Sequence, residues 1–254
     1  MSVKFTILGC GSSLGSPWIT NHIGSSRKKK NIRTRCSAHI QYKNISILID
    51  TSPDIKYQYL KNNLKNIDAV IYTHEHADQT SGIFEMRPFF WKNEKKIPVY
   101  GSNRTLKALK KTHTYCFYER FGYRPIMQAK VVKNRFNIQK QKQILSIIPF
   151  DVVHGLIKAT GYLFEKIAYL SDCNKIPKKS LKYLLNLDYL ILDCLKFRKH
   201  PSHFNYNDAL ELVKIVNPKK TILTNLHTDI DYEVLKKKLP KHIVPAYDGM
   251  SFNF

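Results

Sequence analysis

The sequence predicts an α/β protein built as a four-layer αββα sandwich, in which two mixed β-sheets pack face to face with helices outside them. Two hairpins, each followed by helices and further strands, divide the chain into similar halves, and polar residues directly follow several apolar strands. A chain of 254 residues with 43% apolar residues can bury such a core. We expect residues 1–254 to form a single domain.

In the first half of the chain, turn residues mark the elements. The β-rich run Val3 to Leu8 ends in the glycine loop Gly9 to Gly15, and Lys43-Asn44 splits a hairpin. Residues 16–35 are polar and basic and predict a long exposed loop. The expected strands are 3–8, 38–42, 45–49, 69–72 and 97–100, and the expected helices are 53–62, 103–112 and one after Ser81-Gly82 that ends at Pro88. Residues 115–137 give no clear pattern.

The second half has a clearer alternation of strands and helices. A strand at 144–153 ends at His154-Gly155, and a second hairpin, 162–164 with 167–170, ends at Ser171-Asp172. The remaining expected elements are helices 177–186, 206–216 and 232–238 and strands 189–192, 221–223 and one near Ser251.

Composition limits the classes of function. The N-terminal segment lacks the apolar stretch of a signal peptide, and the apolar runs are too short for a membrane span, so we expect a cytoplasmic protein without a membrane partner. The five cysteines are scattered and odd in number, which predicts reduced, buried thiols. The net charge of +23 indicates either a nucleic-acid partner or compositional bias, since only residues 27–35 and 236–238 form dense basic clusters.

The strongest chemical signal is His74-Glu-His76-Ala-Asp78, which directly follows an apolar strand. Imidazole nitrogens and carboxylates are the ligands that zinc, iron or manganese accept from proteins. His154, Asp172 and His227 also follow strands. Four candidate positions at strand ends predict a metal centre in one groove.

The resemblance to a known family rests on short motifs along nearly the whole chain. They are Gly9-Cys-Gly-Ser-Ser13, Gly15-Ser-Pro17, Leu48-Ile-Asp50, Thr73-His-Glu-His-Ala-Asp78, His154-Gly155, Gly161-Tyr-Leu163, Tyr169-Leu-Ser-Asp172, Leu192-Asp-Cys194, Leu223-Thr-Asn-Leu-His227 and Asp248-Gly-Met250. The chain resembles the metallo-β-lactamase superfamily of hydrolases. Within it, the chain resembles the cyclic-phosphate phosphodiesterases of phosphonate breakdown, which are similar to the tRNA 3′-end endonucleases.

The resemblance implies a role for each candidate residue. His74, His76 and His154 match the histidines around a first metal ion, Asp78 and His227 match ligands of a second ion, and Asp172 matches the carboxylate between them. Asp50 matches a carboxylate that orients a ligand histidine, and His203 matches a histidine near the leaving group. For His203 a flanking position without a role remains the alternative.

Two departures from the family pattern bear on the metal content. Gln79 stands where the family continues with histidine, so we expect the second ion to bind weakly or to be manganese, since an amide oxygen is a harder donor than imidazole. Residues 18–35 contain no cysteine, so we do not expect the structural zinc of the phosphonate-pathway enzymes. One or two divalent ions, zinc or manganese, are therefore expected.

The sequence favours a metal-dependent phosphodiesterase for a small anionic substrate, such as a cyclic phosphate. Metal-bound hydroxide would attack phosphorus, and His203 would protonate the leaving group. Asp78, a ligand of the second ion, is expected to be a catalytic residue as well. Three alternatives stay open: an RNA-processing endonuclease, a carboxylic-ester or thioester hydrolase, and a non-catalytic metal-binding protein. A homodimer also stays open.

Overall fold

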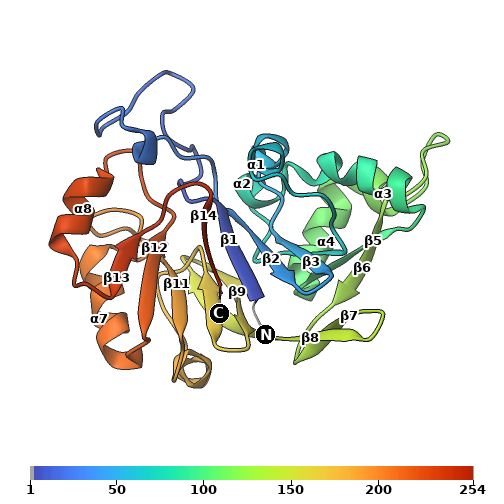
Figure 1. Cartoon of the computed structure of the whole chain (residues 1–254). Coiled ribbons are helices and arrows are strands. Elements are labelled where there is room, and N and C mark those ends of the chain that lie inside the picture. The colour runs from blue at the N-terminus through green and yellow to red at the C-terminus, as the bar shows by residue number, and fades with distance from the viewer. Residues whose placement is uncertain (1–2, 254) are drawn as a thin grey trace.

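The computed structural model describes residues 3–253 and has two seven-stranded mixed sheets (Figure 1). The strand order in the first sheet is β14 (Met250–Asn253), β1 (Val3–Gly9), β2 (Ser37–Tyr42), β3 (Ile45–Ile49), β4 (Ala69–Ile71), β5 (Ile97–Gly101) and β6 (Met127–Val131). In the second it is β13 (Ile243–Pro245), β12 (Lys220–Thr224), β11 (Tyr189–Asp193), β10 (Ile167–Leu170), β9 (Ile157–Phe164), β8 (Gln143–His154) and β7 (Phe136–Lys140).

Each sheet combines an antiparallel and a parallel half. In the first, β14, β1, β2 and β3 pair antiparallel, and β3 to β6 pair parallel. In the second, β7 to β10 pair antiparallel, and β10 to β13 pair parallel. Parallel strands need crossover connections, and these supply the helices of the outer layers. The predicted sandwich of two mixed sheets is confirmed.

The helices cover the outer faces of the two sheets. They are α1 (Ile55–Lys61), α2 (Ala77–Thr80), α3 (Arg87–Asn93), α4 (Asn103–Thr112) and α5 (Thr114–Phe117), then α6 (Lys178–Leu181), α7 (Tyr206–Val216) and α8 (Tyr232–Lys238). Short 3-10 turns span Lys29–Asn31, Ile83–Met86 and Lys182–Leu184. None of the helices in residues 3–253 has the length and apolar character needed to cross a membrane.

Side-chain alternation in the strands builds three layers of core. In β3, Ile47 faces the other sheet and its neighbour Leu48 faces the helices. In β11, Ile191 faces the first sheet while Leu190 packs under the outer helices. Strands buried on both faces are expected in a four-layer sandwich. All five cysteines are buried and unpaired, as the sequence predicts.

Several local predictions need correction. The helix expected up to Pro88 is replaced by α2, a 3-10 turn and α3, because Pro88 lies in the first turn of a helix, where its missing N–H costs nothing. The unassigned stretch contains α5 and β6, and the following β7 begins at Phe136. The strand β13 was not predicted.

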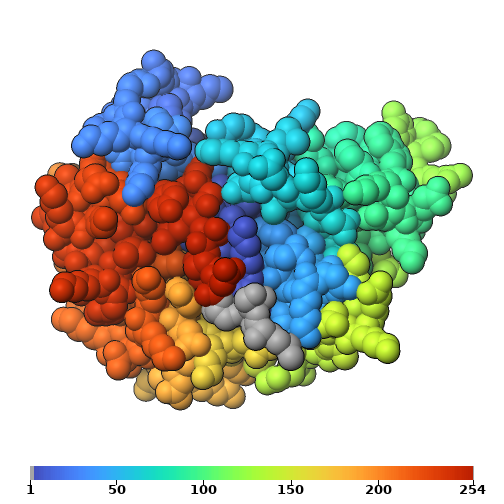
Figure 2. Space-filling model, in the orientation of Figure 1, coloured from blue at the N-terminus to red at the C-terminus, as the bar shows by residue number. Residues whose placement is uncertain are grey.

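The segment expected to be a long exposed loop is partly buried. Arg33 is only 2% exposed, and its guanidinium donates to the carbonyl oxygen of Ile230 at 2.7 Å. Asn31 is also buried and donates to Asp231 at the start of α8. In Figure 2 the blue N-terminal segment accordingly covers part of the red C-terminal surface. The basic cluster at 27–35 is therefore not a continuous exposed surface.

Candidate metal centre

Three imidazole nitrogens converge at the ends of β4 and β8. His74 and His76 follow the buried strand β4, and His154 is the last residue of β8. His74 Nε2 lies 3.0 Å from His76 Nδ1, and His154 Nε2 lies 3.3 Å from the same atom. One ligand atom from each ring lies within 4.8 Å of the others, a spacing compatible with coordination of one cation. The three residues form the three-histidine cluster.

Hydrogen bonds on the outer side of two rings fix their tautomers. The Nδ1 of His154 lies 2.8 Å from the carbonyl oxygen of Ser202, so Nδ1 must carry the proton and Nε2 keeps its lone pair. The Nδ1 of His74 lies 3.0 Å from Thr73 Oγ1, which itself donates to Asp50 Oδ2 at 2.8 Å. The hydroxyl of Thr73 can therefore only accept from His74, and His74 Nε2 also faces the centre with a lone pair.

Burial keeps the His74 imidazole neutral. Removal from water lowers the pKa of His74 to about 3, although the nearby Asp172 carboxylate opposes this shift. A neutral ring with an inward lone pair is the form that binds a metal ion. Asp50 thus lies where the sequence predicts, and it acts on the histidine through Thr73.

Asp172 lies beside the three-histidine cluster at the end of β10. One of its oxygens falls within 4.8 Å of ligand atoms of His154 and His203. Burial would raise the pKa of Asp172, but the imidazoles of His74 and His203 outweigh burial and lower it. A buried carboxylate next to three imidazoles is a donor set that suits a divalent cation, and the described residues therefore fit the expected metal.

Gln79 and Asn225 approach Asp172 as hydrogen-bond donors. Gln79 Nε2 donates to Asp172 Oδ2 at 3.3 Å and to Asp78 Oδ2 at 3.2 Å. Asn225, which follows β12, donates through Nδ2 to Asp172 Oδ1 at 3.4 Å. Asp78 is held at the edge of the pocket, where burial and the Asp172 charge raise the pKa of its carboxyl to about 6.

His203 is held by a second buried carboxylate. Its Nδ1 donates to Asp193 Oδ2 at 2.7 Å, and Asp193 is fully buried at the end of β11. Burial alone would lower the pKa of His203, but the adjacent Asp193 carboxylate raises it to about 9. The ring is therefore a positively charged proton donor at neutral pH, with Nε2 left for the pocket.

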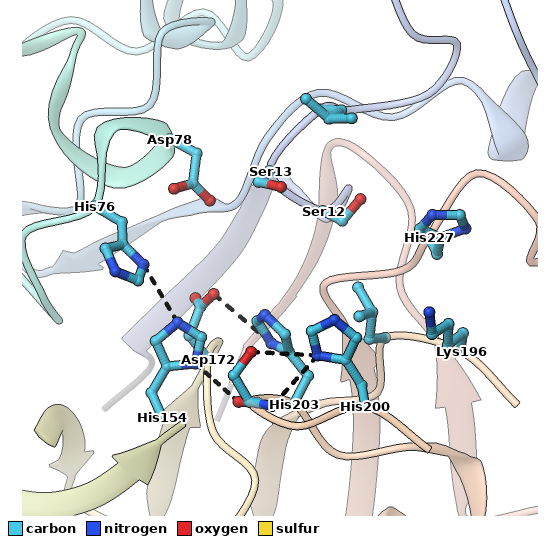
Figure 3. A pocket seen from close by; sticks show the side chains of 13 residues that line it. Ser12, Ser13, His76, Asp78, His154, Asp172, Lys196, His200, His203 and His227 are labelled. Atoms are coloured by element: carbon cyan, nitrogen blue, oxygen red, sulfur yellow. Dashed lines mark hydrogen bonds and ion pairs between the residues drawn. The ribbon is translucent and has the colours of Figure 1, made fainter. Parts of the chain in front are cut away.

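His76, Asp78, His154, Asp172 and His203 line one pocket of about 310 Å³ at the strand ends (Figure 3). Ser12 and Ser13 from the glycine loop, together with Lys196 and His200, complete its polar wall. His227 lines the pocket but does not join the cluster. Its Nδ1 lies 3.1 Å from Asp229 Oδ2, and its ring packs edge-on against Trp18.

The structure brings most of the predicted residues together. Of the predicted residues, His74, His76, His154, Asp172 and His203 come together, with Asp78 and Gln79 beside them and Asp50 behind His74. Asp193 and Asn225 were missed. Asp193 is the last residue of an apolar strand, close to the strand-end position of Asp172, and this signal could have identified it.

Comparison with known proteins gives the same family that the motifs resemble. A beta-lactamase superfamily domain matches residues 46–225. A solved diphosphatase from the PhnP family is 32% identical, with a TM-score of 0.91 and coverage of 100% of this chain and 98% of that chain. Zinc-bound PqqB from Methylobacterium extorquens (15% identical, TM-score 0.82, all of both chains) and human short-form tRNase Z (18%, TM-score 0.71, 99% and 98%) share the fold.

A curated relative has a different name. An octanoyltransferase from Porphyromonas gingivalis is 30% identical over 255 residues, which cover 98% of this chain but 51% of that protein. The chain therefore spans about half the length of the curated relative it matches, and the name of the whole protein does not assign acyl transfer to this half.

Proposed function

Because the chain belongs to the beta-lactamase superfamily and is a hydrolase of the metallo-β-lactamase fold, we propose that it is a metal-dependent phosphodiesterase acting on a small cyclic phosphate or related phosphodiester. The observation that carries the proposal is the His203–Asp193 pair, since a charged imidazole beside a metal-ligand cluster supplies the acid that an alkoxide leaving group needs.

The three-histidine cluster, with Asp172 beside it, would hold the metal. When bound, a divalent ion supplies an activated water and neutralises negative charge on phosphoryl oxygens. The protein prepares this position through the outer hydrogen bonds of His74 and His154, which keep both lone pairs directed inward.

His203 would provide the proton for the leaving oxygen. Asp193 fixes the ring through Nδ1, so the proton on Nε2 is the one available to the pocket. The main-chain N–H of Cys173 also donates to Asp193 at 2.8 Å, which holds the carboxylate in place. Asp193 is a positioning residue for His203.

The pocket favours a small anionic substrate. Its volume of about 310 Å³ is at the lower end of small-molecule sites. Lys196 and the two serine hydroxyls of the glycine loop would bind nonreacting phosphate oxygens. The relative named as a diphosphatase supports a substrate with phosphoryl groups.

A hydrolysis screen of the metal-loaded protein tests the proposal. The probes are an aryl phosphodiester, a five-membered cyclic phosphate, a dinucleoside diphosphate and an octanoyl thioester. We expect turnover of the phosphorus substrates, at least tenfold faster than of the thioester. Faster thioester hydrolysis would instead favour the second candidate, an acyl-group hydrolase, which the name of the octanoyltransferase relative supports. Inactivity on all four would favour a non-catalytic metal-binding protein.

The RNA-processing alternative has its own test. Binding of single-stranded RNA that weakens steeply with salt, together with cleavage, would support a nucleic-acid substrate. We expect neither at physiological salt, since Arg33 is buried and Arg35 pairs with Asp54 through a 2.8 Å hydrogen bond from Nε. Part of the basic cluster is therefore already engaged within the protein.

A further inference from the structure

Both carboxylate oxygens of Asp172 receive an amide N–H from outside the three-histidine cluster. Gln79 donates to Oδ2 and also to Asp78, while Asn225 donates to Oδ1. The same Asn225 amide nitrogen lies 3.2 Å from Asp193 Oδ1. It therefore contacts both Asp172, beside the three-histidine cluster, and Asp193, the partner of His203. Gln79 and Asn225 are buried side chains at 0% and 1% exposure. We call them the amide pair.

An amide N–H is a donor and cannot serve as a metal ligand. With its N–H groups directed at Asp78 and Asp172, Gln79 satisfies two carboxylates that would otherwise need a cation between them. The price is a buried Gln79 Oε1 without a hydrogen-bond partner. If the Gln79 amide were rotated by half a turn, its Oε1 would face Asp78 Oδ2 and Asp172 Oδ2. Three oxygen atoms would then repel one another unless a second ion lay between them.

His227 does not compensate for these amides. Among the described residues, the groups whose ligand atoms converge within 4.8 Å are His74, His76 and His154, and His154 with Asp172 and His203. His227 belongs to neither group. Its Nδ1 accepts from the main-chain N–H of Asp229 at 3.3 Å, and the Asp229 carboxylate lies beside the same atom.

We infer that the centre holds a single metal ion, bound by the three-histidine cluster, and that the amide pair occupies the positions beside Asp172 where a second ion would need ligands. The inference rests on the proposed metal-binding role of the cluster but not on the identity of the substrate. It departs from the two-ion arrangement that the family resemblance implies.

Zinc titration of the chelator-treated full chain tests the inference without any activity measurement. Calorimetry and elemental analysis after equilibrium dialysis should give about one zinc ion per chain in wild type. His227→Gln should leave both the number of ions and the affinity unchanged. Two ions in wild type, with one lost in His227→Gln, would overturn the inference.

Replacing the amide with a carboxylate should create the missing ligand. Gln79→Glu has the same shape but presents an anionic oxygen beside Asp78 and Asp172, so a second zinc ion should bind. Asn205→Asp is the matched control. It adds the same charge, and its carboxylate can still accept the N–H groups of Asn207 and Asp208 at the start of α7, but Asn205 does not contact Asp172.

The control should stay at one ion per chain. If Gln79→Glu also binds only one, the exclusion of a second ion does not come from Gln79, and that assignment is wrong. Failure of the hydrolysis screen with one zinc ion bound would refute the proposed substrate and leave the single-ion inference intact. Thermal melting of each apo variant checks that it folds.

Discussion

The centre has two halves, the three-histidine cluster and the side with Asp78, Gln79 and His227. The sequence predicts metal ligands in both, but the hydrogen-bond partners of their side chains differ. In the three-histidine half, Nδ1 of His74 donates a hydrogen bond to Thr73 Oγ1, and Nδ1 of His154 donates one to the Ser202 carbonyl oxygen. In the other half, Gln79 turns N–H groups toward the carboxylates, and the ligand atoms of His227 do not converge with those of the three-histidine cluster. The comparison teaches that the residue type alone does not make a ligand: the donor atom must also face the centre with a free lone pair.

The largest expected effect comes from removing a ligand of the three-histidine half. His76→Ala or Asp172→Ala should lower zinc affinity by more than about 100-fold and abolish hydrolysis, because the first removes a donor of the cluster and the second removes the carboxylate beside it. Zinc titration and turnover are measured together, with circular dichroism as the check on folding. Unchanged turnover in either variant would mean that the cluster is not the reaction centre.

Loss of the proton donor should produce a smaller and selective effect. His203→Ala should slow an alkyl phosphodiester by about 10²–10⁴-fold but barely affect an aryl phosphodiester, whose phenolate leaves without protonation. Asp193→Asn should give the same selectivity, since its amide cannot stabilise the charged ring. Equal losses on both substrates would indicate that His203 holds the substrate or the structure.

A sharper test of the comparison changes only the far side of His74. In Asp50→Asn the new amide can donate to Thr73 Oγ1, so the Thr73 hydroxyl would point at His74 Nδ1 and leave the ring proton on Nε2. We expect zinc affinity to fall about 10–100-fold. Asn tolerates the positive φ of 60° at this position, so the backbone should be retained.

Thr73→Val is the companion variant, since it interrupts the same connection and leaves Asp50 in place. It should weaken zinc binding to a similar degree. If Thr73→Val kept full zinc affinity while Asp50→Asn lost it, the Asp50 carboxylate would act on the centre without Thr73.

The smallest effect on activity is expected at a buried histidine outside the centre. His39 lies in β2 with Nε2 2.8 Å from Ser46 Oγ, and burial lowers its pKa from 6.5 to about 4. The unfolded chain takes up a proton below about pH 6.5 while the folded chain does not. The stability it contributes is therefore complete above pH 6.5 and falls as the pH drops through 4, by on the order of 3 kcal/mol.

His39→Gln removes this titration and keeps a group that can hydrogen bond to Ser46. Urea unfolding at pH 7 and pH 4 should show a smaller drop in stability for the variant than for wild type, with unchanged zinc binding. An equal pH dependence in both proteins would assign the acid sensitivity to other groups.

Much of the fold could be predicted from local sequence patterns. The helices at 103–112, 206–216 and 232–238 were predicted with the bounds they have. In the structure Ser102, Asn205 and Asp231 each cap the first turn through a side-chain oxygen, so these starts are set locally. Arg33 could not be predicted as buried, since it donates to two carbonyl oxygens nearly 200 positions away in the chain, besides the neighbouring Asn31 side chain. Polarity alone placed it on the surface.

The residues of the three-histidine cluster and Asp172 were predictable because each lies at or just after the end of a strand, and strand ends gather at one edge of a sheet. Which residue after β12 contacts Asp172 was not predictable. Asn225 and His227 both follow β12, and a positive φ of 60° at Asn225 directs the backbone in a way that spacing does not reveal. His227 was predicted because it follows a strand and matches a ligand position of the family pattern.

The pairing of β14 with β1 has a consequence for how the chain acquires its structure. Residues Met250–Asn253 complete the first sheet against its first strand, and Asp248 accepts the main-chain N–H of Cys10 and of Thr34. During synthesis the outer edge of β1 stays unpaired until almost the whole described chain has been made, and unpaired edges favour association between chains. Contacts this far apart in sequence also slow folding. The glycine loop beside the metal centre should therefore become ordered among the last parts of the molecule.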